Sequence, residues 1–419
     1  MSISRRGLLG SGAAAALYGA LAACGSNTGR QDGGSGKGPR IEHWYHQYGE
    51  AGTQQAVERY ARAYPRADVR VQWRPGNYDQ QTAAALLTDS GPDVFEGGPT
   101  LDQIRGGQVV DVTDLLAGVR EDFHPQVLAT KTHRGRIWAV PQVIDTQLLY
   151  YRKSFLAGAG VEPPRTLDAL VDAARALTTK DVKGLFLGND GGPGVLLATP
   201  LYAAGLPVVT EDGEVGFDDP AAARTLGKLH RLHRDRSLLL GAPTDWSDPS
   251  AFLQGLTAMQ WSGLWALPLI AEKLGDDFGV LPFPGDGPGG RPAVPVGAYG
   301  AVVSARGAHR AAAKAYVKWL WVDGTEYQED FALSYGFHIP ARISLAKRAA
   351  ALRKGAAAEV VRFTTDHGYA EPLLWTTASR TAYKDALSRI VKDGADPERE
   401  LRPVVARTRS ELRRVGAAR

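Results

Sequence analysis

The sequence predicts an α/β fold that is divided between two or more domains or lobes. Segments with the alternating pattern of strands and segments with helical periodicity follow one another along most of the chain, which is typical of α/β proteins with largely parallel sheets. The length of 419 residues exceeds the roughly 100–200 residues of a usual domain. A composition that is 44% hydrophobic and 22% charged is that of a globular chain and excludes wholesale disorder.

The expected strands are short apolar or alternating segments bounded by turn residues, such as the turn at Gly91 and Pro92 that precedes the third of them. They lie at 41–45, 69–73, 93–95, 137–151, 184–187, 258–261 and 300–304. The stretch 281–295 is rich in Pro and Gly, and we expect it to be a loop.

The expected helices are the periodic segments, and several have clear start or stop signals. Pro65 ends the first helix, and Thr166 is the expected N-cap of another because it follows Pro163 and Pro164 and precedes an apolar-periodic run. They lie at 53–63, 78–87, 107–116, 166–177, 221–233, 249–255, 309–321, 344–362, 377–392 and 397–414.

The charge balance and the single cysteine exclude several classes of function. The 49 Lys and Arg nearly balance the 45 Asp and Glu, and no basic block appears, so we expect no nucleic-acid partner. One cysteine allows neither an intrachain disulfide nor a Cys-rich metal site. His43, His46 and Glu50 could suggest a metal site, but nothing elsewhere completes it, and we expect neither metal nor cofactor.

The N-terminus has the pattern of an export signal. Arg5 and Arg6 precede an uncharged run of Ala, Gly and Leu that is too short to span a bilayer comfortably. The paired arginines favour the twin-arginine route, with an ordinary Sec signal as the alternative. We therefore assign residues 1–23 to a signal peptide.

The only cysteine stands where this apolar run ends, in the sequence LAACGS at 21–26. The segment resembles the lipobox of bacterial lipoproteins, and the resemblance implies that Cys24 is lipidated; a free structural or reactive thiol is the alternative. Residues 24–39, rich in Gly, Ser, Asn and Asp, are predicted to be a flexible linker. The expected location is therefore extracytoplasmic, at the cell membrane.

Six further motifs, in order, resemble the extracellular solute-binding proteins of carbohydrate ABC transporters, of the maltose and oligosaccharide type. These are the strand, loop and helix of 44–65, GPDVF at 91–95, GRIWAVP at 135–141 with LYYRK at 149–153, PRTLDAL at 164–170, AFLQGLTAM at 251–259 with GLW at 263–265, and GFHIPAR at 336–342. Each motif is weak by itself, and their order carries the resemblance. Arg152 departs from the pattern, since the family has Asn after the paired tyrosines, and the change could alter the lobe-crossing region.

The resemblance implies a two-lobed α/β fold of the periplasmic-binding-protein type (type II), with a hinge and a ligand cleft between the lobes. Chain crossings are expected near 146–150, 294–297 and 339–342. The first lobe would comprise 40–147 and 298–339, and the second 148–297 and 340–419 with the C-terminal helices. The implied function is capture of a sugar, of di- or oligosaccharide size, and its delivery by a monomer to the permease of an ABC importer after hinge closure.

A sugar site needs aromatic faces for the C–H surface of the ring and polar groups for the hydroxyls. The loop after the first strand offers Tyr45, His46 and Gln47 at the edge where α/β sheets bind ligands, whereas Trp44 is expected in the core. Glu96 follows a strand and precedes two glycines that allow close approach of a ligand.

Other candidates follow from their place in loops or beside the implied crossings. Asp145 and Tyr299 adjoin crossings, and Asp190, beside Asn189, lies in a loop where both could equally be turn residues. Trp265 occupies the position of the tryptophan that stacks on sugar in maltose-type relatives. Three more tryptophans are candidates: Trp261 beside it, Trp246 in a polar loop, and Trp375 at the head of the C-terminal helices.

Catalytic motifs are missing from the sequence: it contains no G-x-S-x-G, H-E-x-x-H or C-x-x-C. We therefore expect no enzymatic activity, with an exported glycan-active enzyme as the less favoured alternative. A third alternative keeps the binding fold and changes the ligand to a polyol, a glycerophosphodiester, a peptide or a polyamine, or the role to that of a sensor.

Overall fold

The computed structural model describes residues 38–297 and 299–416. The expected signal peptide, Cys24 and most of the expected linker lie outside these residues. Residues Gly34–Arg419 form one compact unit. Among the described residues, no helix combines the length and the apolar character needed to cross a membrane.

The strands of the described chain are as follows: β1 (Arg40–His46), β2 (Asp68–Arg74), β3 (Val94–Gly97), β4 (Thr132–His133), β5 (Arg136–Ile137), β6 (Val140–Pro141), β7 (Val143–Arg152), β8 (Lys183–Phe186), β9 (Thr257–Gly263), β10 (Phe278–Leu281), β11 (Val294–Gly297), β12 (Gly300–Val303), β13 (Ile339–Pro340) and β14 (Gly368–Tyr369).

The α-helices are as follows: α1 (Thr53–Ala63), α2 (Tyr78–Ala85), α3 (Leu101–Arg105), α4 (Pro125–Ala129), α5 (Lys153–Gly158), α6 (Leu167–Ala176), α7 (Pro193–Leu196), α8 (Thr199–Ala203), α9 (Pro220–Arg234), α10 (Ser250–Leu253), α11 (Leu267–Leu274), α12 (Arg310–Lys318), α13 (Thr325–Leu333), α14 (Ile343–Arg348), α15 (Gly355–His367), α16 (Thr377–Asp393) and α17 (Pro397–Arg414). Short 3-10 or π-helical turns lie at η1 (Thr113–Leu116), η2 (Arg120–Asp122), η3 (Leu264–Ala266), η4 (Trp319–Asp323) and η5 (Ala350–Arg353).

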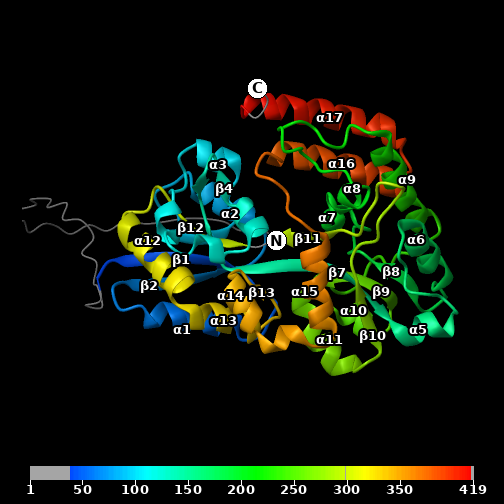
Figure 1. Ribbon diagram of the computed structural model, residues 1–419, viewed down its shortest axis with the longest axis horizontal. Coiled ribbons are helices and arrows are strands. Elements are labelled where there is room, and N and C mark those ends of the chain that lie inside the picture. Colours follow the sequence, from blue (N-terminus) through cyan, green and yellow to red (C-terminus); the bar gives the residue numbers. More distant parts are fainter. Residues whose placement is uncertain (1–37, 298, 417–419) are drawn as a thin grey trace, which may run out of the picture. The chain divides into compact units, whose positions relative to one another are not determined.

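The first body of the fold is a five-stranded sheet in the order β2-β1-β3-β12-β6, which we call the first lobe together with the helices packed on it. β1 runs parallel to β2 and β3, whereas β12 runs antiparallel to β3 and β6. α1 packs against β2 and α12 against β12 (Figure 1). Their buried faces form one core with the aromatic side chains of Tyr45, Tyr60, Tyr316 and Trp321.

The second body is a seven-stranded sheet around β7, which we call the second lobe together with its helices. Here the expectation of largely parallel sheets is wrong, because β7 is antiparallel to β9, β10, β11 and β13. The ten-residue β7 is long enough to pair with different strands along its length, and antiparallel neighbours need no crossover helix between them. α16 and α17 pack on each other and on α9 (Figure 1).

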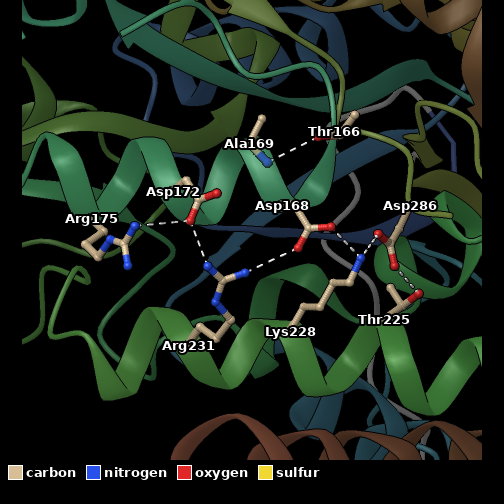
Figure 2. A network of polar contacts seen from close by, with 9 residues as sticks. All are labelled: Thr166, Asp168, Ala169, Asp172, Arg175, Thr225, Lys228, Arg231 and Asp286. Carbon is tan, nitrogen blue, oxygen red and sulfur yellow. Dashed lines mark hydrogen bonds and ion pairs between the residues drawn. The ribbon is translucent and has the colours of Figure 1, made fainter. Parts of the chain in front are cut away.

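Ion pairs between α6 and α9 tie the surface of the second lobe together (Figure 2). The ammonium of Lys228 lies 2.7 Å from Asp168 and 2.6 Å from Asp286, and the guanidinium of Arg231 lies 2.7 Å from Asp172. The carboxylate of Asp286 is nearly buried, so Lys228 neutralises a charge that water reaches poorly.

Three chain segments meet at the start of β7. Ile144 pairs with Ile339 of β13, and Asp145 pairs with Gly297 of β11. Farther along β7, Leu149 pairs with Trp261 of β9 inside the second lobe. Arg152 lies at the far end of β7, where its guanidinium lies 2.8 Å from the carboxylate of Asp277, so the departure from the family pattern does not lie at this meeting point.

Several expected helices have the bounds that the sequence predicts, and others do not. α1 and α17 match the expectation, and the Thr166 side chain accepts a hydrogen bond from the backbone N–H of Ala169, as an N-cap does. The helix expected at 107–116 is wrong, because only η1 is helical there. The helix expected at 344–362 is interrupted, since Ala349 is extended and Gly355 has a φ of 55°, a left-handed value that favours glycine.

Candidate functional site

A cleft of about 740 Å³ lies where β7, β11 and the chain after β3 come together. Its walls come from both lobes: α2, the segment 95–103 and Lys131 on one side, and 195–199 with 369–380 on the other. Asp145 and Gln147 of β7, Pro295–Gly297 of β11 and Tyr299 lie between these two sides. The site is thus built at the ends of strands and beside the segments that join the lobes, where α/β proteins bind small molecules.

Glu96 lies at the cleft wall but is fully buried, and both of its carboxylate oxygens are engaged. Tyr48 donates its hydroxyl to Oε1 at 2.5 Å, and Nδ1 of His46 lies 2.8 Å from Oε2. Burial of His46 opposes protonation, but the neighbouring Glu96 carboxylate raises its pKa above the usual value. Glu96 therefore organises the end of β1 as a buried carboxyl group with two fixed partners.

Asp145 has a different environment. Its Oδ1 lies 2.5 Å from Nδ1 of His338, whose Nε2 lies 3.7 Å from Oε1 of Glu50. Burial of His338 disfavours its charge, yet Asp145 and Glu50 together raise its pKa to about 10. At neutral pH His338 is thus a buried cation between two carboxylates.

Lys131 brings a cation into the same cleft. Its side chain is buried, and this burial lowers its pKa to about 8, while the charge of Asp145 opposes that shift. Gly98 leaves room for it, because a Cβ at that position would lie 3.3 Å from Nζ of Lys131. The second basic side chain of the lining, Arg380, donates a hydrogen bond of 2.8 Å to Glu371.

Aromatic side chains form much of the remaining wall. The hydroxyl of Tyr78 donates to the backbone oxygens of Trp44 and Glu96, at 3.1 and 2.9 Å. The ring of Tyr299 lies 4.8 Å from that of His46, measured between centroids. Tyr369 and Trp375 line the side that belongs to the second lobe. Rigid rings beside carboxylates and a lysine suit a ligand that has both apolar and hydroxyl-bearing faces.

Of the residues that the sequence singles out, Glu96, Asp145, Tyr299 and Trp375 are brought together by the fold as parts of the cleft lining. His46 lies directly behind two of them, in contact with Glu96 and Tyr299.

Four other candidates have different surroundings. Tyr45 is fully buried in the core of the first lobe, and Trp261 is fully buried in the core of the second, because both strands are covered on both faces. Gln47 is exposed and lies outside the lining. Asp190 accepts hydrogen bonds from the backbone N–H groups of Gly192 and Gly194, at 3.0 and 2.7 Å, and so holds its own turn.

Trp246 and Trp265 contact each other edge to face, with ring centroids 5.7 Å apart. The indole of Trp265 donates a hydrogen bond of 2.9 Å to the backbone oxygen of Ser247. Neither ring belongs to the cleft lining. Cys24, the expected lipidation site, lies outside the described residues.

Sequence reasoning missed Tyr78, Lys131, Gln147 and His338. His338 immediately precedes the segment where a crossing is expected, and that position is the one signal that could have indicated it. Lys131 and Tyr78 have no such signal, since they reach the cleft only through the packing of α2 and α4. Within the described chain, no group of three or more His, Cys, Asp or Glu side chains is placed to hold a metal ion.

Residues 44–323 match the family model of the bacterial extracellular solute-binding proteins. The match covers more than half of the chain, and the protein therefore belongs to this family, whose members are extracytoplasmic binding proteins of transport systems rather than enzymes. The fold is accordingly a two-lobed one of the periplasmic-binding-protein type.

Solved structures agree with this fold. The GacH receptor of Streptomyces glaucescens, solved without ligand and with acarbose, is 24% identical with a TM-score of 0.76, over 90% of this chain and 99% of that one. Maltose-bound MalE3 of T. maritima is 21% identical with a TM-score of 0.73, over 89% and 99%. UgpB of Mycobacterium tuberculosis, in complex with glycerophosphocholine, is 20% identical with a TM-score of 0.73, over 90% and 98%.

Proposed function

We propose that the protein captures a sugar, of di- or oligosaccharide size, in the cleft between its lobes and delivers it to the permease of an ABC importer. The observation that carries the proposal is the cleft itself, in which aromatic rings, carboxylates and Lys131 surround a volume of about 740 Å³ next to the crossing strands. Closure about these strands would enclose the ligand, and the ligand shifts the open–closed equilibrium by its preference for the closed form.

The proposed ligand contacts are polar and aromatic groups of the lining. We assign hydroxyl recognition to Asp145, Lys131 and Gln147, and ring contact to Tyr299 and Trp375. Trp265 keeps a proposed role as a sugar-stacking residue on the strength of its motif alone, and Trp265→Ala tests that role separately from the cleft.

The location follows from the sequence outside the described residues. We propose that the signal peptide 1–23 is removed and that lipidated Cys24 holds the protein, as a monomer, at the outer face of the membrane. Metabolic labelling with a radioactive or clickable fatty acid tests this, because Cys24→Ala should abolish both the label and the membrane association.

A glycerophosphodiester is the second candidate ligand, and Lys131 and Arg380 are the observation that favours it. A phosphodiester needs cationic partners, and both side chains belong to the lining. The lining also contains the acidic side chains Asp79, Glu96, Asp102, Asp145 and Glu371, which would repel an anion. The surplus of carboxylates therefore favours an uncharged polyhydroxylated ligand over a phosphodiester.

A thermal-shift and calorimetric screen of the purified chain tests the ligand class. The panel comprises maltose, mannobiose, alpha-D-tagatose, glycerophosphocholine, polyols and short peptides. A specific ligand at 100 times its Kd should stabilise the folded state by about 2.7 kcal/mol. Stabilisation by a sugar supports the proposal, whereas stabilisation by glycerophosphocholine alone replaces it with the second candidate. Release of products from oligosaccharides would instead indicate an enzyme.

A further inference from the structure

The two carboxylates at the crossing strands are not equivalent. Both oxygens of Glu96 have partners, and its side chain has no exposed surface. Asp145 is bonded through Oδ1 to His338, and 30% of its side chain is exposed to the cleft that it lines. Within the described residues no hydrogen bond engages its Oδ2. Asp145 thus presents one free acceptor atom, whereas Glu96 presents none.

The orientation of Asp145 depends on a single side chain from another segment. His338 immediately precedes β13, and the next residue, Ile339, pairs with Ile144, the residue before Asp145. The imidazole is nearly buried, and its second nitrogen faces Glu50 in the loop between β1 and α1. Gly336 makes this possible, because a Cβ there would lie 3.0 Å from Nε2 of His338 and 2.9 Å from Cγ of Glu50.

We propose that His338 is a positioning residue for ligand binding: it fixes the carboxylate of Asp145 with Oδ2 presented to the cleft as the acceptor for a ligand hydroxyl. The inference rests on the proposed function in one respect, namely that the ligand carries hydroxyl groups. His338 bonds β7 to the segment that leads into β13 and is itself held by the first-lobe loop, so the acceptor is oriented by the same segments that join the lobes.

The charges around His338 keep its imidazole doubly protonated at neutral pH. Asp145 faces it from β7 and Glu50 from the β1–α1 loop. Beyond these two carboxylates lie His46 with Glu96, and Lys131, whose pKa responds to Asp145. With its pKa raised to about 10, His338 stays a double donor up to mildly alkaline pH and loses one proton above that.

The first test needs no ligand. In the full chain labelled at its nine histidines, NMR titration should show the His338 ring protonated until about pH 10. Asp145→Asn should move this titration toward the ordinary value of 6.5. A ring that titrates near 6.5 in the unmodified protein, and is unmoved by Asp145→Asn, would overturn the inference.

The second test measures binding of maltose, mannobiose and alpha-D-tagatose by calorimetry between pH 6 and 10. His338→Gln should weaken binding about tenfold, the usual effect of losing a charged hydrogen bond, and should remove the loss of affinity near pH 10. His233→Gln on α9, outside the cleft lining, is the matched control. It should change neither the affinity nor the loss of affinity near pH 10. The pKa of Lys131 is about 8, so its protonation can also change the affinity within this pH range. Lys131→Met shows how much of the pH dependence comes from the lysine and how much from His338.

The outcomes distinguish the inference from the proposed function. Binding by His338→Gln that equals the unmodified protein, with a folded variant by circular dichroism, would overturn the positioning role. Should His338→Gln fail to fold, Asp145→Asn takes its place, and the NMR titration still decides the pairing. If no sugar binds while the His338 titration moves as expected, the sugar proposal fails and the His338–Asp145 pairing stands.

Discussion

The indole Nε1 of Trp261 donates a hydrogen bond of 2.9 Å to Oε1 of Gln147. Trp261 is fully buried in the core of the second lobe, whereas Gln147 lines the cleft. A core residue therefore determines where a cleft amide points. The sequence predicts direct contact of Trp261 with a ligand, whereas this bond gives it an indirect route, through Gln147, to whatever occupies the cleft.

We expect Trp261→Phe to lower both stability and affinity. The ring that remains fills most of the core site, but Gln147 loses its donor and the free energy of unfolding falls by about 1–3 kcal/mol. Trp265→Phe is the matched control for stability, since Trp265 is half-buried and bonded to the backbone of Ser247, and it should lower the free energy of unfolding by about 1 kcal/mol or less. Urea denaturation of both variants checks the stability, and calorimetry of Trp261→Phe checks the affinity. Equal losses of stability in the two variants would contradict the prediction that the buried Trp261 contributes more than the half-buried Trp265.

The second prediction concerns the ion pairs of Figure 2. Lys228→Met should lower the free energy of unfolding by about 1–3 kcal/mol, because it leaves the nearly buried carboxylate of Asp286 with only the hydroxyl of Thr225 as a partner in this network. Arg175→Met on the same surface removes a contact of 3.6 Å between exposed groups and should cost less than about 0.5 kcal/mol. Denaturant titrations in which both variants lose the same stability would contradict the special role of Lys228.

Local signals explain which parts of the fold the sequence predicts. α1 and α17 have periodic apolar positions and clear ends, and the cap of Thr166 on α6 needs nothing beyond the next three residues. The order of β7 with β9, β10, β11 and β13 depends on long-range pairing, and the sequence predicts parallel neighbours there wrongly.

The residues of the candidate site also divide into those that local sequence signals indicate and those that only the folded chain reveals. Glu96, Asp145 and Tyr299 follow strands or adjoin crossings, and such positions point to the cleft from the sequence alone. The burial of Tyr45 and Trp261 depends on which face of a sheet is covered, which their own strands do not reveal. The contact between His338 and Asp145 joins residues that are 193 positions apart, so only the folded chain shows it.

The third prediction is a loss of stability with rising pH that depends on Asp145. The pKa of His338 is about 10 in the folded protein and 6.5 when the chain is unfolded. The folded state therefore binds the additional proton between these values, and its contribution is complete below about pH 6.5 and is lost as the pH approaches 10. The melting temperature of the unmodified protein should fall between about pH 6.5 and 8, before Lys131 begins to lose its proton, and Asp145→Asn should flatten the curve there. An unchanged slope in Asp145→Asn would contradict the assignment.

Lys131 leads to the fourth prediction, with the opposite sign. Its pKa falls from 10.5 to about 8 on folding, so the unfolded chain binds the additional proton between these values and stability rises with pH across them. Lys131→Met removes this titration, so the variant should lack the rise in stability that the parent shows between pH 8 and 10.5. A constant difference over the whole range would show that Lys131 does not titrate as its burial indicates.

The fifth prediction concerns a contact between the C-terminal helix and the cleft wall. Nη1 of Arg414 in α17 lies 3.0 Å from Oδ1 of Asp102 in α3, and Asp102 lines the cleft. Arg105 adds a hydrogen bond of 3.3 Å to the backbone oxygen of Arg414. α17 packs in the second lobe and α3 in the first. A movement that separates the two lobes would break these contacts, so we expect them to favour the closed form of the cleft.

About half of each of these two side chains is exposed, so the ion pair contributes only about 0–1 kcal/mol and is weakened by salt. Arg414→Ala should therefore raise the Kd of the bound ligand about two- to fivefold at low salt, and this effect should vanish near 1 M salt. Arg409→Ala is the matched control, because its partner Asp218 belongs to the same lobe and the pair is equally exposed. Calorimetry in which both variants bind alike at low salt would show that the Arg414–Asp102 contact does not contribute to closure.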